Sequence, residues 1–293
     1  MSALGLGVAG MVPRFALATS DGTAGVLAFD GDSIVVAGRT LRVSRDGGAG
    51  WTEQEPPGQV LALATHRDRP GRFVAGLAEG GVGKSGDGGA TWHIGSAGLP
   101  TGEVNAIAIG SREPDLIYAA IRGDGLYKSE DAGESWALAM DRPWLDEAER
   151  DPLTLVSVDL ETGMGGIWIY AGTERGLTRV PDCFCRWQDV QPGNAMDALV
   201  AGDAPPPANP LPKGEPVMSL ASSPSVPERL YAALASGIWT SADGGLVWKQ
   251  VAEGTVSAIA VHPEDETYVA ALMGGALKLS RDSGATWTET AAT

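Results

Sequence analysis

One turn motif, Ser-x-Asp-x-Gly-x-x-Trp, recurs along the chain and constrains its fold more than any other feature. Five close copies occupy residues 44–51, 85–92, 129–136, 241–248 and 280–287. A sixth unit, residues 180–187, has lost the serine and glycine but keeps the tryptophan. Where the copies follow one another directly, they lie about 40 residues apart, which is the length of one four-stranded propeller blade.

The motif has the chemistry of a tight turn between two strands. Its aspartate can accept hydrogen bonds from backbone N–H groups within the turn, and its serine can add a second local bond. Its glycine supplies the positive φ that other residues resist. The tryptophan then opens the next strand and buries a large apolar surface against a neighbouring unit. The sequence therefore assigns a structural role to ten residues: Asp46, Asp87, Asp131, Asp243, Asp282, Trp51, Trp92, Trp136, Trp248 and Trp287.

The segments before each turn repeat as well. An apolar strand is expected at 34–38, 73–77, 117–121, 169–173, 230–234 and 268–272, and a short third strand follows it. Upstream lies a further strand, at 60–64, 104–109, 154–158, 217–221 and 256–261, whose small alanines suit crowding near a central axis. With the strand that the tryptophan opens, each unit has four strands in meander order.

These patterns predict an all-β fold, a six-bladed β-propeller of four-stranded antiparallel blades that forms a single domain over residues 1–293. The repeats run approximately over 13–57, 58–100, 101–145, 150–191, 214–252 and 253–293. Residues 15–19 look like an additional strand. That strand either closes the ring by pairing with the last blade or forms the inner strand of the first. The sequence does not decide whether a seventh, partial blade is present.

Composition narrows the range of partners. The formal net charge of −16 opposes binding to nucleic acid and to anionic membranes. The N-terminus lacks the basic start of a secretory signal, and no apolar run is long enough to span a membrane, so we expect a cytoplasmic monomer. Cys183 and Cys185 are separated by one residue and have no nearby histidine. We interpret them as ordinary thiols, which fits a reducing compartment, and we expect no metal and no cofactor.

The repeated motif resembles the Asp-box, or BNR-repeat, propellers over about residues 25–290. That group includes sialidases, sortilin-type receptor domains, xyloglucan-cleaving glycosidases and photosystem II assembly factors. The resemblance implies that the motif turns lie on the face away from the usual ligand site. The motif indicates fold far more than function, because it recurs across unrelated activities.

The opposite face is therefore where we expect a site. Two long crossings between blades lie there, residues 137–152, in which 144–150 suggest a short helix, and residues 188–216, which include a proline-rich run. Polar residues after the second strands would ring the channel mouth and could hold a carboxylated or hydroxyl-rich ligand, although simple salt bridging at the rim is the alternative. The candidate ligand-binding residues are Arg39, Glu79, Arg122, Asp124, Trp144, Glu174, Arg175 and Met273.

The enzyme hypothesis has little support in the residues. The five tyrosines all fall in repeated strands, so a free nucleophilic tyrosine of the sialidase kind is hard to find. Other glycosidases need two carboxylates across a cleft, and nothing in the sequence pairs the candidates, which are Glu79, Asp124, Asp146, Glu147 and Glu174. The leading hypothesis is a non-catalytic module that binds a protein partner or a carbohydrate through this face and its two long loops. The alternative is a carbohydrate-active hydrolase or lyase with acidic residues on the same face.

Overall fold

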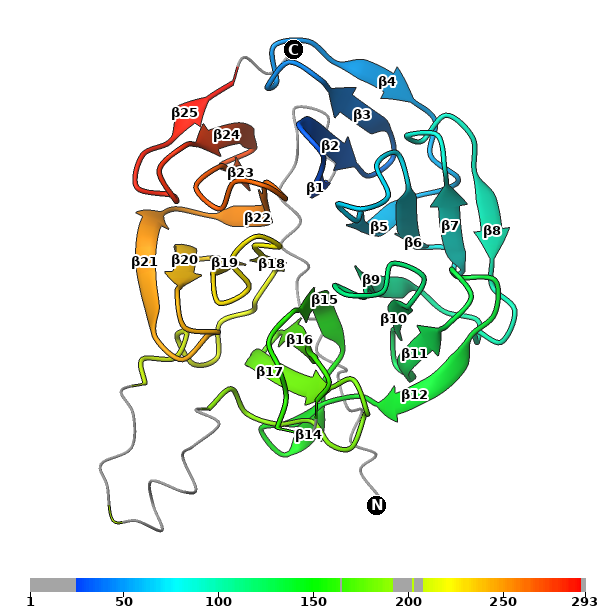
Figure 1. Ribbon diagram of the computed structural model, residues 1–293, viewed down its shortest axis with the longest axis vertical. Coiled ribbons are helices and arrows are strands. Elements are labelled where there is room, and N and C mark those ends of the chain that lie inside the picture. Colours follow the sequence, from blue (N-terminus) through cyan, green and yellow to red (C-terminus); the bar gives the residue numbers. More distant parts are fainter. Residues whose placement is uncertain (1–24, 164, 192–201, 203–207, 291–293) are drawn as a thin grey trace, which may run out of the picture.

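Six small antiparallel sheets stand around a central axis in the computed structural model (Figure 1). The structure describes residues 25–163, 165–191, 202 and 208–290. The described secondary structure consists of strands, and the sheets follow one another around the ring in chain order. The predicted six-bladed β-propeller is confirmed.

Each blade is a meander that runs from the central axis outward. The first three blades comprise β1 (Val26–Asp30), β2 (Ser33–Ala37), β3 (Leu41–Ser44) and β4 (Thr52–Gln54); β5 (Val60–Ala64), β6 (Phe73–Leu77), β7 (Val82–Ser85) and β8 (His93–Gly95); and β9 (Val104–Ile109), β10 (Ile117–Ile121), β11 (Gly125–Ser129) and β12 (Ala137–Asp141). A small hairpin of β13 (Trp144–Leu145) and β14 (Ala148–Glu149) follows.

The fourth blade has three strands, β15 (Pro152–Val158), β16 (Trp168–Thr173) and β17 (Gly176–Pro181). A single bridge between Arg179 and Gln188 stands where the other blades have an outer strand. The last two blades comprise β18 (Ser219–Ser222), β19 (Leu230–Leu234), β20 (Gly237–Ser241) and β21 (Trp248–Glu253); and β22 (Val256–Val261), β23 (Val269–Met273), β24 (Ala276–Ser280) and β25 (Thr288–Glu289).

The second strand of each blade is buried on both faces, since a neighbouring blade packs on each side. All five residues of β6, β10, β19 and β23 are buried. This double burial explains why these segments read as continuous apolar runs instead of alternating ones.

Six hydrophobic clusters join the blades, one at each interface around the ring. Every motif tryptophan packs in the cluster shared with the preceding blade. Trp136, for example, lies among side chains of β6, β7 and β10, and its Nε1–H donates to the carbonyl oxygen of Gly95 at 3.2 Å. Trp51 closes the circle by packing with side chains of β22, β23 and β24 in the last blade.

The five complete motif copies form one repeated turn, here called the Ser–Asp–Trp turn. In the third blade Ser129 Oγ donates to Asp131 Oδ1 at 2.8 Å and accepts from Gly133 N–H at 2.8 Å. The same two bonds recur at 2.7–2.9 Å in the other four copies. The serine is buried each time, so its hydroxyl is satisfied entirely by the turn.

Among the described residues, the first and last blades meet through side chains. The four described strands of the first blade come from the start of the described chain, and those of the last blade come from its end. Strand β1 packs directly beside β22 (Figure 1), where Phe29 lies edge-on to Tyr268 at 5.0 Å between ring centroids. The inner strand of the first blade is thus β1. The proposed strand at 15–19 lies outside the described residues, and the idea that it fills this inner position is wrong.

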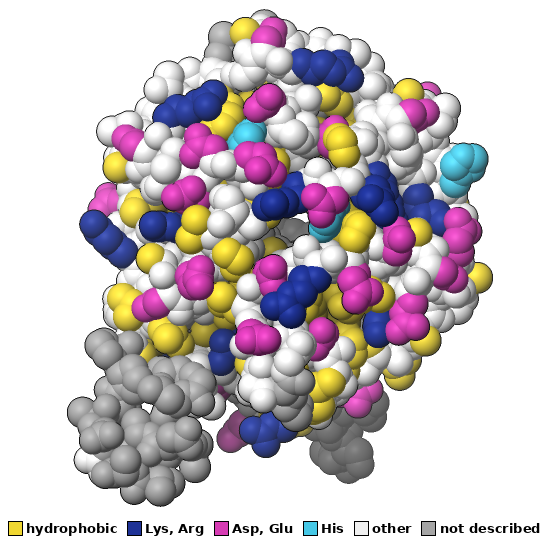
Figure 2. Space-filling model, in the orientation of Figure 1, with side chains coloured by type: hydrophobic (Ala, Val, Ile, Leu, Met, Phe, Trp, Pro, Cys, Tyr) yellow, Lys and Arg dark blue, Asp and Glu magenta, His cyan; other side chains and the backbone are white. Residues whose placement is uncertain are grey.

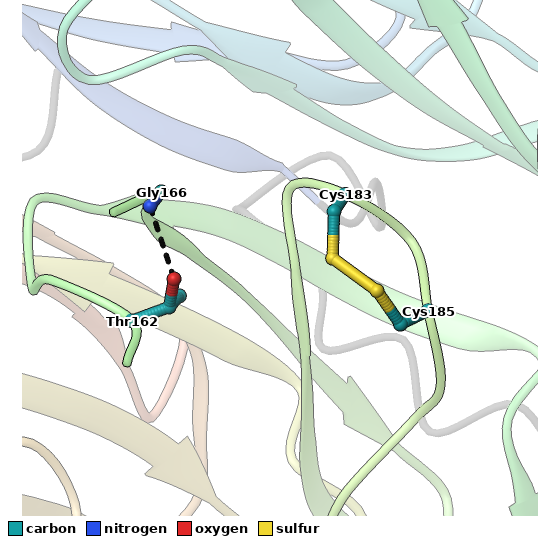
Figure 3. Close-up of a disulfide and its surroundings, with 4 residues drawn as sticks. All are labelled: Thr162, Gly166, Cys183 and Cys185. Carbon is teal, nitrogen blue, oxygen red and sulfur yellow. Dashed lines mark hydrogen bonds between the residues drawn. A yellow bond between two sulfur atoms is a disulfide. The ribbon is translucent and has the colours of Figure 1, made fainter. Parts of the chain in front are cut away.

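Two local expectations are also wrong. Residues 144–150 contain the hairpin β13–β14 in place of a short helix. Cys183 and Cys185 are joined by a disulfide, with their Cα atoms 5.5 Å apart, so they are not free thiols (Figure 3). The argument from free thiols for a reducing compartment therefore falls away.

Candidate binding site

The turns that follow the second strands lie on the face opposite the Ser–Asp–Trp turns, and they carry the residues expected to bind a ligand. Arg39 is exposed in the β2–β3 turn. Glu79 accepts a hydrogen bond from Gln59 N–H at 3.2 Å, which ties it to the crossing between the first two blades. Met273 is only 8% exposed and packs in the cluster between blades five and six, so it belongs to the core.

The remaining candidates gather where the third and fourth blades meet. Arg122 pairs with Glu103 at 2.7 Å, and this hydrogen-bonded pair raises the pKa of the guanidinium. Asp124 accepts from the Tyr127 hydroxyl at 2.6 Å. Burial, with the bond to Asp124, raises the pKa of Tyr127 to about 12. The polar side chains of the β10–β11 turn are thus already bonded to protein partners.

The hairpin β13–β14 is tied to both blades. Arg150 pairs with Glu174 of the β16–β17 turn at 2.8 Å, and its Nε–H donates to the carbonyl oxygen of Leu145 at 3.2 Å. On the other side, Asp151 accepts from Gly123 N–H at 2.8 Å and from Arg142. These contacts hold the hairpin across the junction of the third and fourth blades.

Trp144 stands exposed on this hairpin. It is 66% accessible, the highest fraction among the large hydrophobic side chains of the described residues. The two residues at the hairpin tip, Asp146 and Glu147, have φ of 50° and 60°. Left-handed φ at both central positions defines a two-residue hairpin turn that normally requires Asn-Gly or Asp-Gly. The hairpin tip is therefore locally strained, and the hairpin β13–β14 holds the exposed indole of Trp144 in a fixed position.

Two carboxylates of this face lie beside arginines. Glu174 faces Arg150, and Asp146 lies 3.9 Å from Arg175. A glycosidase needs two carboxylates that face each other across a cleft, whereas Glu174 and Asp146 each lie beside an arginine.

Described residues line two hollows in the central channel. One, of about 100 Å³, lies between the first halves of the inner strands, on the side of the candidate residues. The other, of about 200 Å³, opens among the loops that follow the inner strands, on the side of the Ser–Asp–Trp turns. Figure 2 shows a face of the ring that is hollowed at its centre and surrounded by basic, acidic and histidine side chains.

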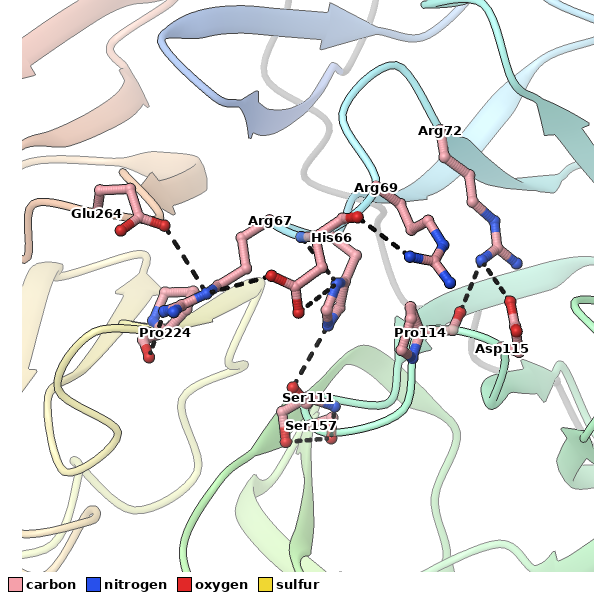
Figure 4. A network of polar contacts seen from close by, with 11 residues as sticks. His66, Arg67, Arg69, Arg72, Ser111, Pro114, Asp115, Ser157, Pro224 and Glu264 are labelled. Carbon is pink, nitrogen blue, oxygen red and sulfur yellow. Dashed lines mark hydrogen bonds and ion pairs between the residues drawn. The ribbon is translucent and has the colours of Figure 1, made fainter.

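Arg67 crosses the mouth of the larger hollow (Figure 4). It projects from the second blade, donates from Nη1 to the carbonyl oxygen of Pro224 at 3.2 Å, and places Nε 3.7 Å from Glu264. Beside it, His66 Nδ1 accepts from Asp68 N–H at 3.2 Å, so Nε2 carries the proton and donates to the Ser111 carbonyl oxygen at 3.3 Å. The second, fifth and sixth blades are thus linked across the channel.

Sequence reasoning missed this mouth because it placed the site on the other face. A signal was present, since His66 and His262 both follow an inner strand at equivalent places in their repeats. In the structure His262 lies 3.0 Å from Asp32 of the first blade, so each histidine links its own loop to an adjacent blade.

Within the described part of the chain, no group of His, Cys, Asp or Glu side chains is placed to hold a metal ion. The described residues also contain no helix long and apolar enough to cross a membrane.

No family model matches the sequence. No curated protein matches it either. Solved structures do match. The GH74 enzyme of Niastella koreensis has a TM-score of 0.57 and 14% identity, over 89% of this chain and 46% of that one. The β-propeller domain of Myceliophteria thermophila Cps50 (Swd1) has a TM-score of 0.53 and 15% identity, over 88% of this chain and 97% of that one. YCF48 bound to D1 peptide has a TM-score of 0.50 and 14% identity, over 93% of this chain and 79% of that one.

These likenesses show a shared β-propeller fold. The chain spans less than half the length of the GH74 enzyme. The matching structures include enzymes and a propeller solved with a peptide, so the fold is compatible with both kinds of activity.

Proposed function

We propose that this chain is a non-catalytic binding or assembly module of the Asp-box propeller group. Its contact face is the one that carries the β10–β11 and β16–β17 turns and the hairpin β13–β14. The exposed Trp144 carries the proposal. Tryptophan is enriched among the few residues that carry most of the binding energy of protein interfaces, and an exposed indole on a frame held by ion pairs loses little entropy on binding.

Charge indicates the kind of partner. Asp124, Asp146 and Glu147 are all exposed around the hairpin and its neighbouring turn, and the whole chain carries −16. A protein segment with an apolar side chain next to lysine or arginine would place the first on Trp144 and the second among these carboxylates. Complementary charge of this kind favours both specificity and association rate.

The test is selection from a random peptide library displayed on phage, with the full chain immobilised. We expect enriched peptides that combine an apolar and a basic residue, and we expect Trp144→Ala to weaken their binding about thirtyfold, as for a hot spot of about 2 kcal/mol. Val247→Ala is the matched control, because Val247 is also exposed but lies in a Ser–Asp–Trp turn on the opposite face. Peptides that bind wild type and Trp144→Ala equally would contradict the proposal.

The alternative is a carbohydrate-active hydrolase or lyase on the same face. The likeness in fold to a GH74 enzyme favours it, as does Trp144, because an exposed indole can also stack on a sugar ring. A broad glycan screen with Glu174→Gln and Asp124→Asn as controls decides this. Turnover that either substitution abolishes would replace the binding proposal with an enzyme, whereas absence of turnover in the wild type favours the binding module.

A further inference from the structure

The turn of the fourth blade is closed by chemistry that the other five blades do not use. Aligned on Trp187, the segment keeps the motif aspartate as Asp182 but has Val180 in place of the serine and Phe184 in place of the glycine. The Ser–Asp hydrogen bond of the other blades cannot form without the serine. The Cys183–Cys185 disulfide takes its place (Figure 3).

The residue enclosed by this disulfide has a backbone conformation that glycine adopts in the other blades. Phe184 has φ of 54°, and the glycines at the same motif position have φ between 83° and 92°. An L-residue in the left-handed region costs about 1–2 kcal/mol relative to glycine. Because the bond encloses only Phe184, breaking it lets this one residue return to an ordinary φ, and the released strain favours the reduced form.

Both sulfur-bearing residues are open to solvent. Cys183 and Cys185 are exposed, and the next residue, Arg186, is an exposed cation that favours a thiolate nearby. Exposed or strained disulfides are the ones that exchange readily with thiols, in contrast to buried structural disulfides.

The turn is also seated firmly on the third blade. The Phe184 ring lies 5.8 Å from that of buried Tyr118, and Trp187 Nε1–H donates to the Asp141 carbonyl oxygen at 2.7 Å. On its other side Asp182 fits against Gly166, where an added Cβ would lie 1.9 Å from the carboxylate. Reduction or oxidation of the cysteines therefore changes the constraint on Phe184, the packed aromatic side chain between them.

We propose that Cys183–Cys185 is a thiol–disulfide exchange site whose substrates are low-molecular-weight or peptide thiols. A substrate thiolate attacks the sulfur of one cysteine, the Cys183–Cys185 bond breaks, and a mixed disulfide forms while the other cysteine leaves as a thiolate. A second substrate thiolate then attacks the substrate sulfur of the mixed disulfide. The products are one substrate disulfide and the two reduced cysteines, which take up the two protons that the substrate thiols release. Two electrons pass from the substrate thiols to the protein.

The first measurement is equilibration of the folded full chain in glutathione buffers, with free thiols counted by alkylation and mass spectrometry. We expect reversible reduction across the range of reduced-to-oxidised glutathione ratios, and a trapped glutathione adduct on Cys183 in Cys185→Ser. A disulfide that stays oxidised under millimolar reduced glutathione, or that does not re-form, would overturn the proposal.

A matched pair of variants tests the role of the backbone. Phe184→Ala and Phe184→Gly both remove the ring that packs on Tyr118, but only glycine is free of the left-handed penalty. We expect the disulfide of Phe184→Gly to be about fivefold to thirtyfold harder to reduce than that of Phe184→Ala, which is the 1–2 kcal/mol penalty expressed as an equilibrium ratio. Equal midpoints for the two variants would show that backbone strain does not set the reactivity, and would overturn that part of the proposal.

Discussion

At the scale of single residues, the chain repeats one set of hydrogen bonds, that of the Ser–Asp–Trp turn. A buried serine and an exposed aspartate close each Ser–Asp–Trp turn, and the aspartate accepts further bonds from backbone N–H groups and nearby hydroxyls. Hydrogen bonds from Thr91 and Ser85 lower the pKa of Asp87 to about 2, and those from Thr286 and Ser280 do the same for Asp282. The serines, aspartates and glycines of these turns could be identified from sequence, because all their partners lie within seven residues.

These lowered pKa values predict a dependence of stability on pH. A carboxyl whose pKa falls on folding stabilises the native state above its ordinary value of 3.8 and loses that contribution as the pH falls toward 2. We therefore expect the free energy of unfolding, measured with urea, to decline between pH 4 and pH 2, as the shift of Asp87 from 3.8 to about 2 requires. Asp87→Asn should be less stable than wild type at pH 7, and the gap should narrow below pH 3. A gap that stays constant down to pH 2 would contradict the assignment.

Two tryptophans should respond oppositely to truncation. Trp144 is 66% exposed and Trp248 is 1% exposed. Trp144→Ala should change the free energy of unfolding by no more than about 0.5 kcal/mol, whereas Trp248→Ala should cost about 3–5 kcal/mol through the cavity it leaves. Urea denaturation of both variants checks this. A large loss in Trp144→Ala would mean that the indole is a packing residue and not a presented one.

At the scale of elements, the hairpin β13–β14 shows where local sequence misleads. Residues 144–150 are rich in leucine, alanine, glutamate and arginine, which favour helix. The hairpin forms because Arg150 and Asp151 find partners on the β16–β17 and β10–β11 turns, which are distant in sequence. Tertiary contacts of this kind leave no periodic pattern in the sequence, so the element could not be predicted from propensity.

The strained hairpin tip makes a prediction of its own. Glu147→Gly should stabilise the protein by up to about 1 kcal/mol, because glycine accepts positive φ without penalty. Asp146→Pro should open the hairpin, because proline is confined to negative φ. Thermal unfolding and hydrogen exchange of residues 144–149 measure both effects. If Asp146→Pro left exchange in this segment unchanged, the hairpin would not depend on its turn.

At the scale of the whole molecule, six apolar interfaces hold the ring. The roughly 40-residue period and the buried second strands could be predicted from the sequence because every blade repeats them. The departures from the period could not. The disulfide at Cys183–Cys185 occurs in one blade only, and the bridge that Arg67 forms over the channel depends on contacts that a single repeat does not contain.

Closure through side chains predicts that the joint between the first and last blades matters as much as any other. Phe29→Ala at that joint and Phe73→Ala between the first two blades both remove a buried ring, and each should cost about 3–5 kcal/mol in one cooperative transition. Tryptophan fluorescence during urea unfolding reports this. A Phe29→Ala variant that unfolds in two stages, or that loses little stability, would show that the ring is not closed as described.

The central claim is that partners bind on the face of Trp144. Hydrogen–deuterium exchange of the full chain, with and without a peptide selected on it, measures this most directly. The account predicts protection of residues 122–124, 144–149 and 174–176, with no change in the loops around Arg67 and Glu264. Protection confined to those loops, across the mouth of the larger hollow, would place binding on the opposite face and contradict the account.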